Sequence, residues 1–417
     1  MGTKPRSLPQ TPRSTSTSVR SNGVLPGLEA LARARPRWLK GRRLGLLMHQ
    51  ASVTSKLESA RDVLHRLAGS GLAALFGPQH GITGEKQDNM IESAHGVDSR
   101  LGIPVFSLYS ETRRPTKEML STIDTLIVDL QDVGTRVYTF EWTTALALQA
   151  CAEADIPVVL LDRPNPLGGL LMEGNLVRPG YESFVGLYPV PMRHGLTLGE
   201  MALLVNQRLA ARAGHPRCDL TVVPMPGWRR RMLWSDTGLP WVLPSPNMPF
   251  PLTAEVYPGQ VLLEGTSLSE GRGTTRPFEL FGAPWLDPGR LFERFRRRRL
   301  PGCTLRAHDF QPTFHKWQGQ VCRGFQIHVT DTQRYRSYFT TLALLQDVIT
   351  LHPGRLEWKQ PPYEYVTDRL PIDVLTGDPA IREALESGAP LAPLAAGWKK
   401  EIREFQREAK DFLLYRD

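Results

Sequence analysis

The sequence predicts a Rossmann-like α/β fold, in which a parallel-sheet domain is followed by a smaller C-terminal α+β domain. Short apolar runs recur through the first half of the chain, and amphipathic stretches separate them. The runs have no polar face, which is typical of strands that are covered on both sides of a parallel sheet. The stretches between them are long enough to be crossover helices. Polar and glycine-rich segments also follow three of the runs, as ligand-binding loops do in such folds.

The first strand is predicted at residues 42–48, and a helix that ends in glycine follows at 57–71. Further strands are predicted at 72–78, 103–109, 124–134, 156–166, 218–225 and 261–265, with helical segments at 113–123, 141–154 and 197–214. A stretch rich in proline and tryptophan (227–249) and a glycine-rich loop (266–285) complete this part. A strand at 324–331 and a helix at 338–352 are predicted in the remainder. We therefore expect a disordered basic tail (1–22), a Rossmann-like catalytic domain (23–286) and a C-terminal α+β domain (287–417).

The composition is that of a globular protein with an excess of basic residues. The chain has 417 residues, with 51 basic and 42 acidic side chains and a net charge of +9. The basic residues gather in 1–22, 33–43 and 294–299 without interleaved aromatic residues or a zinc-finger pattern, so solvated faces are favoured over nucleic-acid binding. An anionic polymer such as a cell-wall glycan would be attracted to the same surface.

No apolar run reaches the roughly 18 residues needed to span a membrane. The four cysteines are scattered, as expected of reduced core thiols. The first 22 residues contain no apolar signal segment, which predicts a cytoplasmic protein. A misassigned start would leave a periplasmic or extracellular location open.

Known cofactor and nucleophile motifs are absent. The segment after the first strand, MHQASVTS, lacks the G-x-G-x-x-G fingerprint, so NAD and FAD are not expected. Neither G-x-S-x-G nor H-E-x-x-H occurs, and the histidines are dispersed. We expect no metal and no cofactor.

Carboxylates are frequent in the polar segments that follow the strands, which suggests acid–base chemistry at a shared site. Glu92 lies in a polar loop where no helix or strand pattern explains an acid, and it is our candidate for the general acid. Asp132, in the polar end of the strand predicted at 124–134, is the candidate that completes the displacement. Whether the reaction retains or inverts configuration depends on the carboxylate spacing, and the sequence leaves this open.

The remaining candidates are binding residues, and several have a structural alternative. Arg136 and Arg163 are suited to grip an anionic group, although Arg136 could instead pair with Asp132. Asp162 could serve only to anchor the proline-rich turn after it, and Glu264 and Glu270 could serve only to brace Arg272. Tyr138 offers a face for a sugar ring or belongs to the core. Asn165 and Asn247, each between prolines, are rigidly held amides. The full set of predicted substrate-binding residues is His80, Arg136, Tyr138, Asp162, Arg163, Asn165, His194, Asn247, Glu264, Glu270 and Arg272.

Several phrases of the sequence together resemble one family. They are FGPQHGITGE, VDLQDVGTRVYTF, LLDRPNPLGG, PVPMRHGLTLGEMA, PSPNMP and LLEGTSLSEGRGTTRPFELFGAPW. The chain, from about Gly23 to Asp417, is similar to the NamZ family of exo-β-N-acetylmuramidases. The resemblance implies a cleft between the two domains, and it implies no metal and no nucleotide. It also implies release of terminal N-acetylmuramic acid (MurNAc) from the non-reducing end of MurNAc–GlcNAc-type peptidoglycan fragments, in cell-wall turnover or recycling.

The chain departs from this family at one position of the first phrase. The family motif usually reads Pro-Glu-His-Gly, whereas this chain has Gln79. Two further functions therefore stay open: a non-catalytic glycan-binding protein of the same fold, and a cell-wall esterase or amidase. The missing nucleophile motif argues against the second of these.

Overall fold

The computed structural model describes residues 23–87, 90–211 and 215–417. Seven strands form the large sheet in the order β3-β4-β2-β1-β5-β6-β7. They are β1 Leu44–Met48, β2 Leu72–Gly77, β3 Gly96–Val97, β4 Pro104–Ser107, β5 Thr125–Asp129, β6 Val158–Leu161 and β7 Leu220–Val223. All neighbouring strands are parallel except β3, which is antiparallel to β4. Without β3 the order is that of the Rossmann fold, which confirms the predicted fold class.

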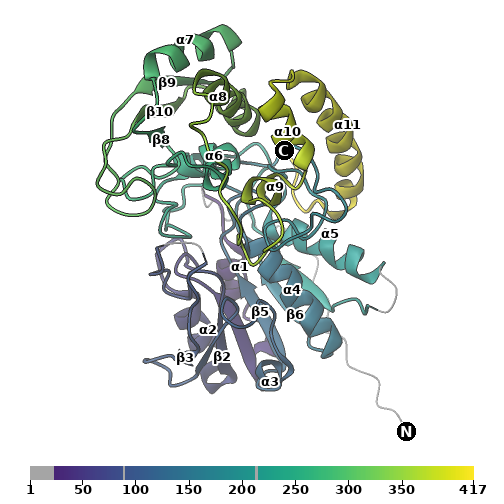
Figure 1. Cartoon of the computed structure of the whole chain (residues 1–417). Coiled ribbons are helices and arrows are strands. Elements are labelled where there is room, and N and C mark those ends of the chain that lie inside the picture. The colour runs from purple at the N-terminus through teal and green to yellow at the C-terminus, as the bar shows by residue number, and fades with distance from the viewer. Residues whose placement is uncertain (1–22, 88–89, 212–214) are drawn as a thin grey trace.

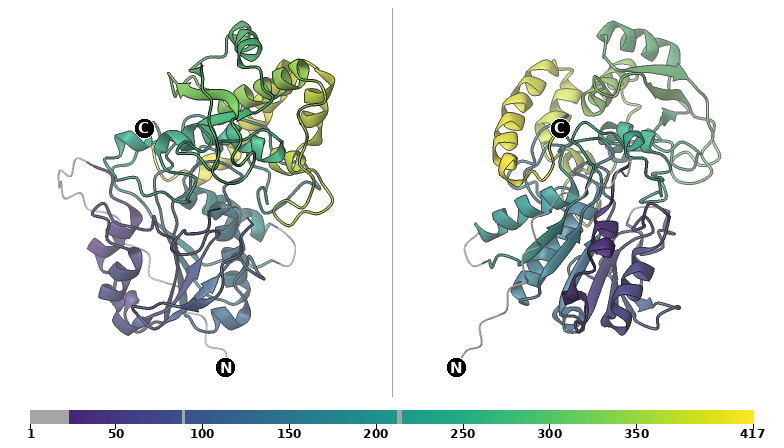
Figure 2. Two further views of the ribbon diagram at one scale, coloured as in Figure 1. Left: turned by 60° about the vertical axis from the view of Figure 1, so that its left-hand side comes forward. Right: turned by 180° about the vertical axis from the view of Figure 1, so that it is seen from behind.

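The helices lie on both faces of the large sheet and around the second domain (Figures 1 and 2). The α-helices are α1 Gly27–Ala34, α2 Ala60–Ala68, α3 Lys117–Leu120, α4 Phe140–Glu153, α5 Leu198–Ala210, α6 Pro251–Gln260, α7 Pro288–Arg298, α8 Ser337–Leu351, α9 Pro371–Thr376, α10 Pro379–Ser387 and α11 Ala392–Ala409. The short 3₁₀ helices are η1 Arg37–Leu39, η2 Gly69–Gly71, η3 Trp234–Asp236, η4 Val261–Gly265 and η5 Lys410–Phe412.

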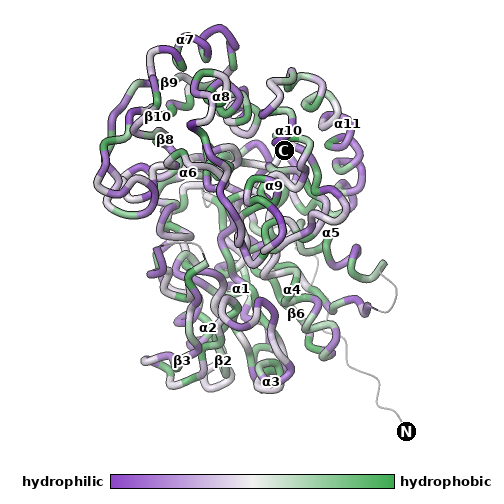
Figure 3. The backbone as a smooth tube through the Cα atoms, viewed as in Figure 1, coloured by the Kyte–Doolittle hydropathy of each residue, from purple (hydrophilic) through white to green (hydrophobic). Residues whose placement is uncertain are grey.

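Burial explains why the strands are so apolar. Every residue of β1, β5 and β6 is buried, because helices cover both faces of the sheet. By contrast, α7 and α11 are largely hydrophilic on the outside of the second domain (Figure 3). Within the described residues, no helix is long and apolar enough to cross a membrane.

The second domain contains an antiparallel sheet in the order β8-β10-β9, made of β8 Leu280–Ala283, β9 Cys303–Ala307 and β10 Arg323–Val329. Helix α7 contacts β10 and α8, and α6 packs on α8. In Figure 1 this domain lies above the large sheet. The predicted smaller α+β domain is therefore present.

Two predictions about the later elements were wrong. The segment 261–265, expected as a strand, is the 3₁₀ helix η4, because it continues α6 and is buried on every side. A fully buried apolar run gives no periodicity that would separate the two structures. Strand β8 lies in the expected glycine-rich loop, before the predicted boundary at 286/287, yet it pairs with β10 of the second sheet. The predicted tail, residues 1–22, lies outside the described residues.

Candidate active site

A narrow polar pocket lies where the carboxyl end of β2 and the segment after β5 meet the second domain. Gln79 and His80 lie in the loop that follows β2, and Tyr138 and Thr139 lead into α4. The second domain adds residues from α6, η4 and the loop before α9. The lining residues are Gln79, His80, Val137, Tyr138, Thr139, Val185, Ser245, Asn247, Met248, Tyr257, Glu264, Arg272, Phe278, Tyr363 and Glu364.

The free space inside this pocket, about 40 Å³, is enough for a few water molecules but not for a sugar ring. Aromatic and polar side chains fill the rest of it. A ligand of monosaccharide size therefore enters only when some lining side chains move.

Glu264 faces the pocket as one member of an ion pair. Its carboxylate accepts hydrogen bonds from Arg272 (2.7 Å) and from the Tyr363 hydroxyl (2.6 Å). Behind Arg272 lies Glu270, whose second carboxylate oxygen accepts from Lys316 Nζ at 2.8 Å. Burial alone would raise the pKa of Glu270, but Lys316, together with His315 and Arg272, lowers it far below its ordinary value. This buried network holds Arg272 and therefore Glu264 in place.

Glu364 faces the same pocket but has a different environment. It is 3% exposed, and within the described chain no arginine or lysine forms an ion pair with it. Its carboxyl group accepts hydrogen bonds from the Tyr109 hydroxyl (2.8 Å) and from Gln79 Nε2 (3.2 Å). Burial raises the pKa of Glu364 to about 7, and the nearby Glu264 contributes to the rise. The pocket thus contains an ion-paired carboxylate and a carboxyl group that holds a proton near neutral pH.

Gln79 is oriented by Thr139, the residue immediately before α4. The Thr139 hydroxyl donates to Gln79 Oε1 at 2.6 Å, and it makes no side-chain hydrogen bond that would cap its own helix. With Oε1 occupied, the amide nitrogen of Gln79 points to Glu364. The sequence analysis identified Gln79 only as a departure from a motif and did not identify its contacts.

Five of the predicted binding residues line the pocket: His80, Tyr138, Asn247, Glu264 and Arg272. The main-chain oxygens of Lys86 and Gln87 accept hydrogen bonds from His80 Nδ1 and Asn247 Nδ2. Glu264 also braces Arg272, so its structural alternative holds as well.

The predicted general acid, Glu92, is not among the lining residues. Its side chain is 54% exposed, and it accepts a hydrogen bond from the Tyr365 hydroxyl at 3.2 Å. Arg113 lies 3.9 Å away. Its partner Tyr365 directly follows Glu364, but Glu92 itself does not line the pocket with Glu264.

Asp132 and His194 belong to a separate buried cluster with Glu141. Nε2 of His194 lies 3.3 Å from Glu141 and 3.7 Å from Asp132, and burial raises the pKa of Glu141 well above its ordinary value. The three side chains are close enough to hold a metal ion. Nδ1 of His194, however, accepts a hydrogen bond from the Leu196 amide, so a neutral imidazole carries its proton on Nε2. That tautomer directs an N–H, and not a lone pair, at the carboxyl groups, which disfavours a metal ligand.

The other predicted residues stabilise the fold around the site. Arg136 is fully buried and donates to the carbonyl oxygens of four residues, so it pairs with neither an anion nor Asp132. Arg163 forms an ion pair with Asp129 at 2.5 Å. Asp162 accepts hydrogen bonds from Thr197, Gly199 and Tyr415, which supports its alternative as an anchor.

Asn165 orders the loop after β6. Its Oδ1 accepts from the Leu167 amide, and its Nδ2 donates to the Leu196 carbonyl. Gly134, with φ +76°, packs against it, and a Cβ atom there would lie 2.3 Å from Asn165 Oδ1. This close approach explains the glycine of the Gln-Asp-Val-Gly phrase.

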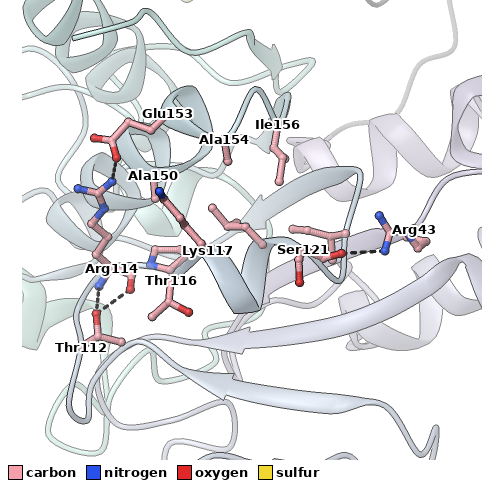
Figure 4. A pocket seen from close by; sticks show the side chains of 13 residues that line it. Arg43, Thr112, Arg114, Thr116, Lys117, Ser121, Ala150, Glu153, Ala154 and Ile156 are labelled. Atoms are coloured by element: carbon pink, nitrogen blue, oxygen red, sulfur yellow. Dashed lines mark hydrogen bonds and ion pairs between the residues drawn. The ribbon is translucent and has the colours of Figure 1, made fainter. Parts of the chain in front are cut away.

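A larger pocket of about 630 Å³ lies at the opposite, amino-terminal edge of the sheet (Figure 4). Arg114 pairs with Glu153 there, and Arg43 donates to the Ser121 carbonyl. Arg43 and Arg114 thus already have partners, and Glu153 is the one acidic residue among those that line the pocket, so it contains no pair of carboxyl groups. Its size does not make it the better candidate site.

Sequence reasoning missed Tyr109, Tyr257, Tyr363 and Glu364. The phrase PPYEY at 361–365 offers a signal, an acid between two tyrosines after two prolines, with no helical or strand pattern. What brings Glu364 to Gln79, 285 positions earlier, is tertiary packing.

The fold and the site define a two-domain α/β protein with a pair of carboxyl groups in a pocket between its domains. The profile described as exo-β-N-acetylmuramidase NamZ, N-terminal, matches residues 44–251, and the corresponding C-terminal profile matches residues 255–415. The chain belongs to this family.

Relatives of known sequence and structure agree with this. The chain is 42% identical to the peptidoglycan β-N-acetylmuramidase NamZ of Bacillus subtilis (strain 168) over 404 residues, which cover 97% of this chain and 94% of the relative. Two crystal structures of DUF1343 family proteins from Bacteroides fragilis NCTC 9343 are similar to it. The first has a TM-score of 0.84 and 34% identity, and covers 95% of this chain and 100% of its own. The second has a TM-score of 0.74 and 28% identity, and the match covers 94% of this chain and 99% of the second structure's chain.

Proposed function

We propose that this protein is an exo-β-N-acetylmuramidase, which hydrolyses the glycosidic bond of a terminal MurNAc residue at the non-reducing end of peptidoglycan fragments. The observation that carries the proposal is the pocket between the domains. It presents one ion-paired carboxylate, Glu264, and one buried carboxyl group, Glu364, whose pKa burial raises to about 7, to the same space. Glycoside hydrolysis commonly needs such a pair of carboxyl groups with different protonation states.

The other lining residues suit a charged amino sugar. Tyr138, Tyr257 and Phe278 supply apolar faces for a pyranose ring, and Asn247 is an amide at the edge of the pocket. Arg272 is paired with Glu264 through Nη2, but its Nη1 makes no hydrogen bond within the described residues and is suited to bind a lactyl carboxylate. The family membership and the curated relative support the same substrate class.

The proposal includes two more specific statements about the function. The substrates are MurNAc–GlcNAc disaccharides, and the enzyme serves the recycling of cell-wall fragments. The cytoplasmic location stays a prediction from the sequence.

Hydrolysis is tested by incubating the purified full-length chain with the MurNAc–GlcNAc disaccharide and measuring free MurNAc by mass spectrometry. We expect release of MurNAc from this substrate and none from GlcNAc–MurNAc, in which the other sugar is terminal. Binding of the disaccharide without turnover between pH 4 and pH 9 would contradict the proposal and favour the non-catalytic alternative.

A further inference from the structure

We propose that Glu364 is the general acid of the reaction and that the Glu264 carboxylate acts opposite it, in place of the acid predicted at Glu92. This inference rests on the proposed function. It goes beyond family membership because it assigns the catalytic step to a residue of the C-terminal half of the chain.

The geometry of the pocket selects Glu364. Among the described residues that line it, only Glu264 and Glu364 are acidic. Glu264 forms an ion pair with Arg272 and accepts a second hydrogen bond from the Tyr363 hydroxyl. Glu364 is 3% exposed, and neutral donors, Tyr109 and Gln79, contact its two oxygens. The hydrogen bonds from these donors and the charge of Arg113 favour the ionised form, but burial and the nearby Glu264 outweigh them, so Glu364 is a weaker acid than a carboxyl group in water, as an acid catalyst needs at neutral pH.

The contact between Gln79 and Glu364 leaves only one of the two side chains able to transfer a proton. Gln79 stands where the family motif has glutamate, and its amide cannot titrate. Thr139 fixes the amide so that it donates to Glu364. Gln79 is therefore a positioning residue, and Glu364 is the member of this contact that can transfer a proton.

The step balances as a hydrolysis. Glu364 gives its proton to the glycosidic oxygen while the bond from that oxygen to C1 breaks, and the bonding electron pair leaves with the oxygen. The Glu264 carboxylate stabilises the positive charge that develops on the ring. A water molecule adds its oxygen to C1, and its released proton returns to the carboxyl pair, which restores the starting charge.

Glu92 is in a poor position for this role. Its side chain is 54% exposed, lies outside the pocket lining and contacts Tyr365 and Arg113. A general acid has to reach the glycosidic oxygen of a substrate in the pocket, and Glu92 does not face that space.

The decisive experiment compares leaving groups in the full-length chain. Glu364→Gln and the matched control Glu92→Gln are assayed on the MurNAc–GlcNAc disaccharide and on 4-nitrophenyl β-MurNAc, whose leaving group needs no protonation. We expect Glu364→Gln to lose about 10²–10⁴-fold in kcat/KM on the disaccharide and less than about 10-fold on the nitrophenyl glycoside. Glu92→Gln is expected to stay within about 3-fold of wild type on both.

Equal losses of Glu364→Gln on the two substrates would overturn the assignment, because a structural defect does not depend on the leaving group. Leaving-group dependence in Glu92→Gln, with Glu364→Gln active, would return the role to Glu92. Thermal unfolding of both variants excludes misfolding as the cause. A wild-type chain that cleaves neither substrate would instead refute the proposed function itself.

A second variant tests the proton directly. The Tyr109 hydroxyl lowers the pKa of Glu364 by donating to its carboxylate. Tyr109→Phe should therefore move the alkaline limb of the kcat/KM profile to higher pH. An unchanged limb, with a uniformly reduced rate, would show that Tyr109 has only a structural role and that the limb does not belong to Glu364.

Discussion

Removing the ionisable group at Glu364 should change how stability depends on pH, whether or not the enzyme turns over. The pKa of Glu364 in the folded protein is about 7, against an ordinary value of 4.5. Below about pH 4.5 both the folded and the unfolded chain carry the proton. Between about pH 4.5 and pH 7 only the folded chain keeps it, so stability falls as the pH rises. Above about pH 7 both states are ionised, and the loss is complete.

The magnitude follows from the difference between these values. At about 1.4 kcal/mol per pH unit, the wild type should lose about 3 kcal/mol relative to Glu364→Gln between pH 4 and pH 8. The assay is urea denaturation of both proteins at closely spaced pH values, with Glu92→Gln showing the effect of losing an exposed carboxylate. Parallel curves for wild type and Glu364→Gln would refute the reasoning, because they would mean that the buried carboxyl group titrates like one in water.

Three further predictions concern the residues that stabilise the fold around the pocket. Arg136→Met should lower the free energy of unfolding, measured by urea denaturation, by at least about 3 kcal/mol, because four buried carbonyl oxygens lose a charged donor. A decrease of less than about 1 kcal/mol would contradict this prediction. Tyr415→Phe removes a 2.6 Å hydrogen bond to Asp162, and the free energy of unfolding should fall by about 1–3 kcal/mol at pH 8. Burial raises the pKa of Asp162 to about 6, so this carboxyl group is protonated at pH 4, and the loss of stability should be smaller there. A loss that is independent of pH would show that the carboxylate is not the relevant acceptor. Gly134→Ala should lower the free energy of unfolding by about 2–4 kcal/mol, because Gly134 has a positive φ and a Cβ atom there would clash with Asn165. The control Gly397→Ala, in the exposed part of α11, should leave the stability unchanged or raise it. Similar effects of the two substitutions in thermal unfolding would argue against the clash.

Most of the large sheet could be predicted from the sequence, since local patterns suffice there. The strands at 44–48, 125–129 and 158–161 are apolar throughout, and the helices α4, α5 and α8 lie where periodic segments were expected. The second domain was harder. Residues 261–265 are as apolar as a strand, and only their packing after α6 makes them a 3₁₀ helix.

The site was predicted in part. His80 and Tyr138 belong to segments that follow strands, and the edge of a parallel sheet brings such segments together. The same reasoning predicted Glu92 as the general acid, because it lies in a polar loop where no helix or strand pattern explains an acidic residue. Sequence pattern does not tell which side of a loop faces solvent, and the exposed fraction of Glu92 shows the consequence.

The sequence by itself determined the fold class, the positions of the buried strands and the family, because these depend on local apolar patterns and on short phrases of fixed spacing. Only the tertiary structure decided which carboxyl groups share a pocket and which of them keeps a proton. The physical reason is that a carboxyl group's pKa depends on burial and on partners from distant segments. Glu264 has Arg272 beside it, whereas Glu364 has Tyr109 and Gln79, and these contacts exist only in the folded chain.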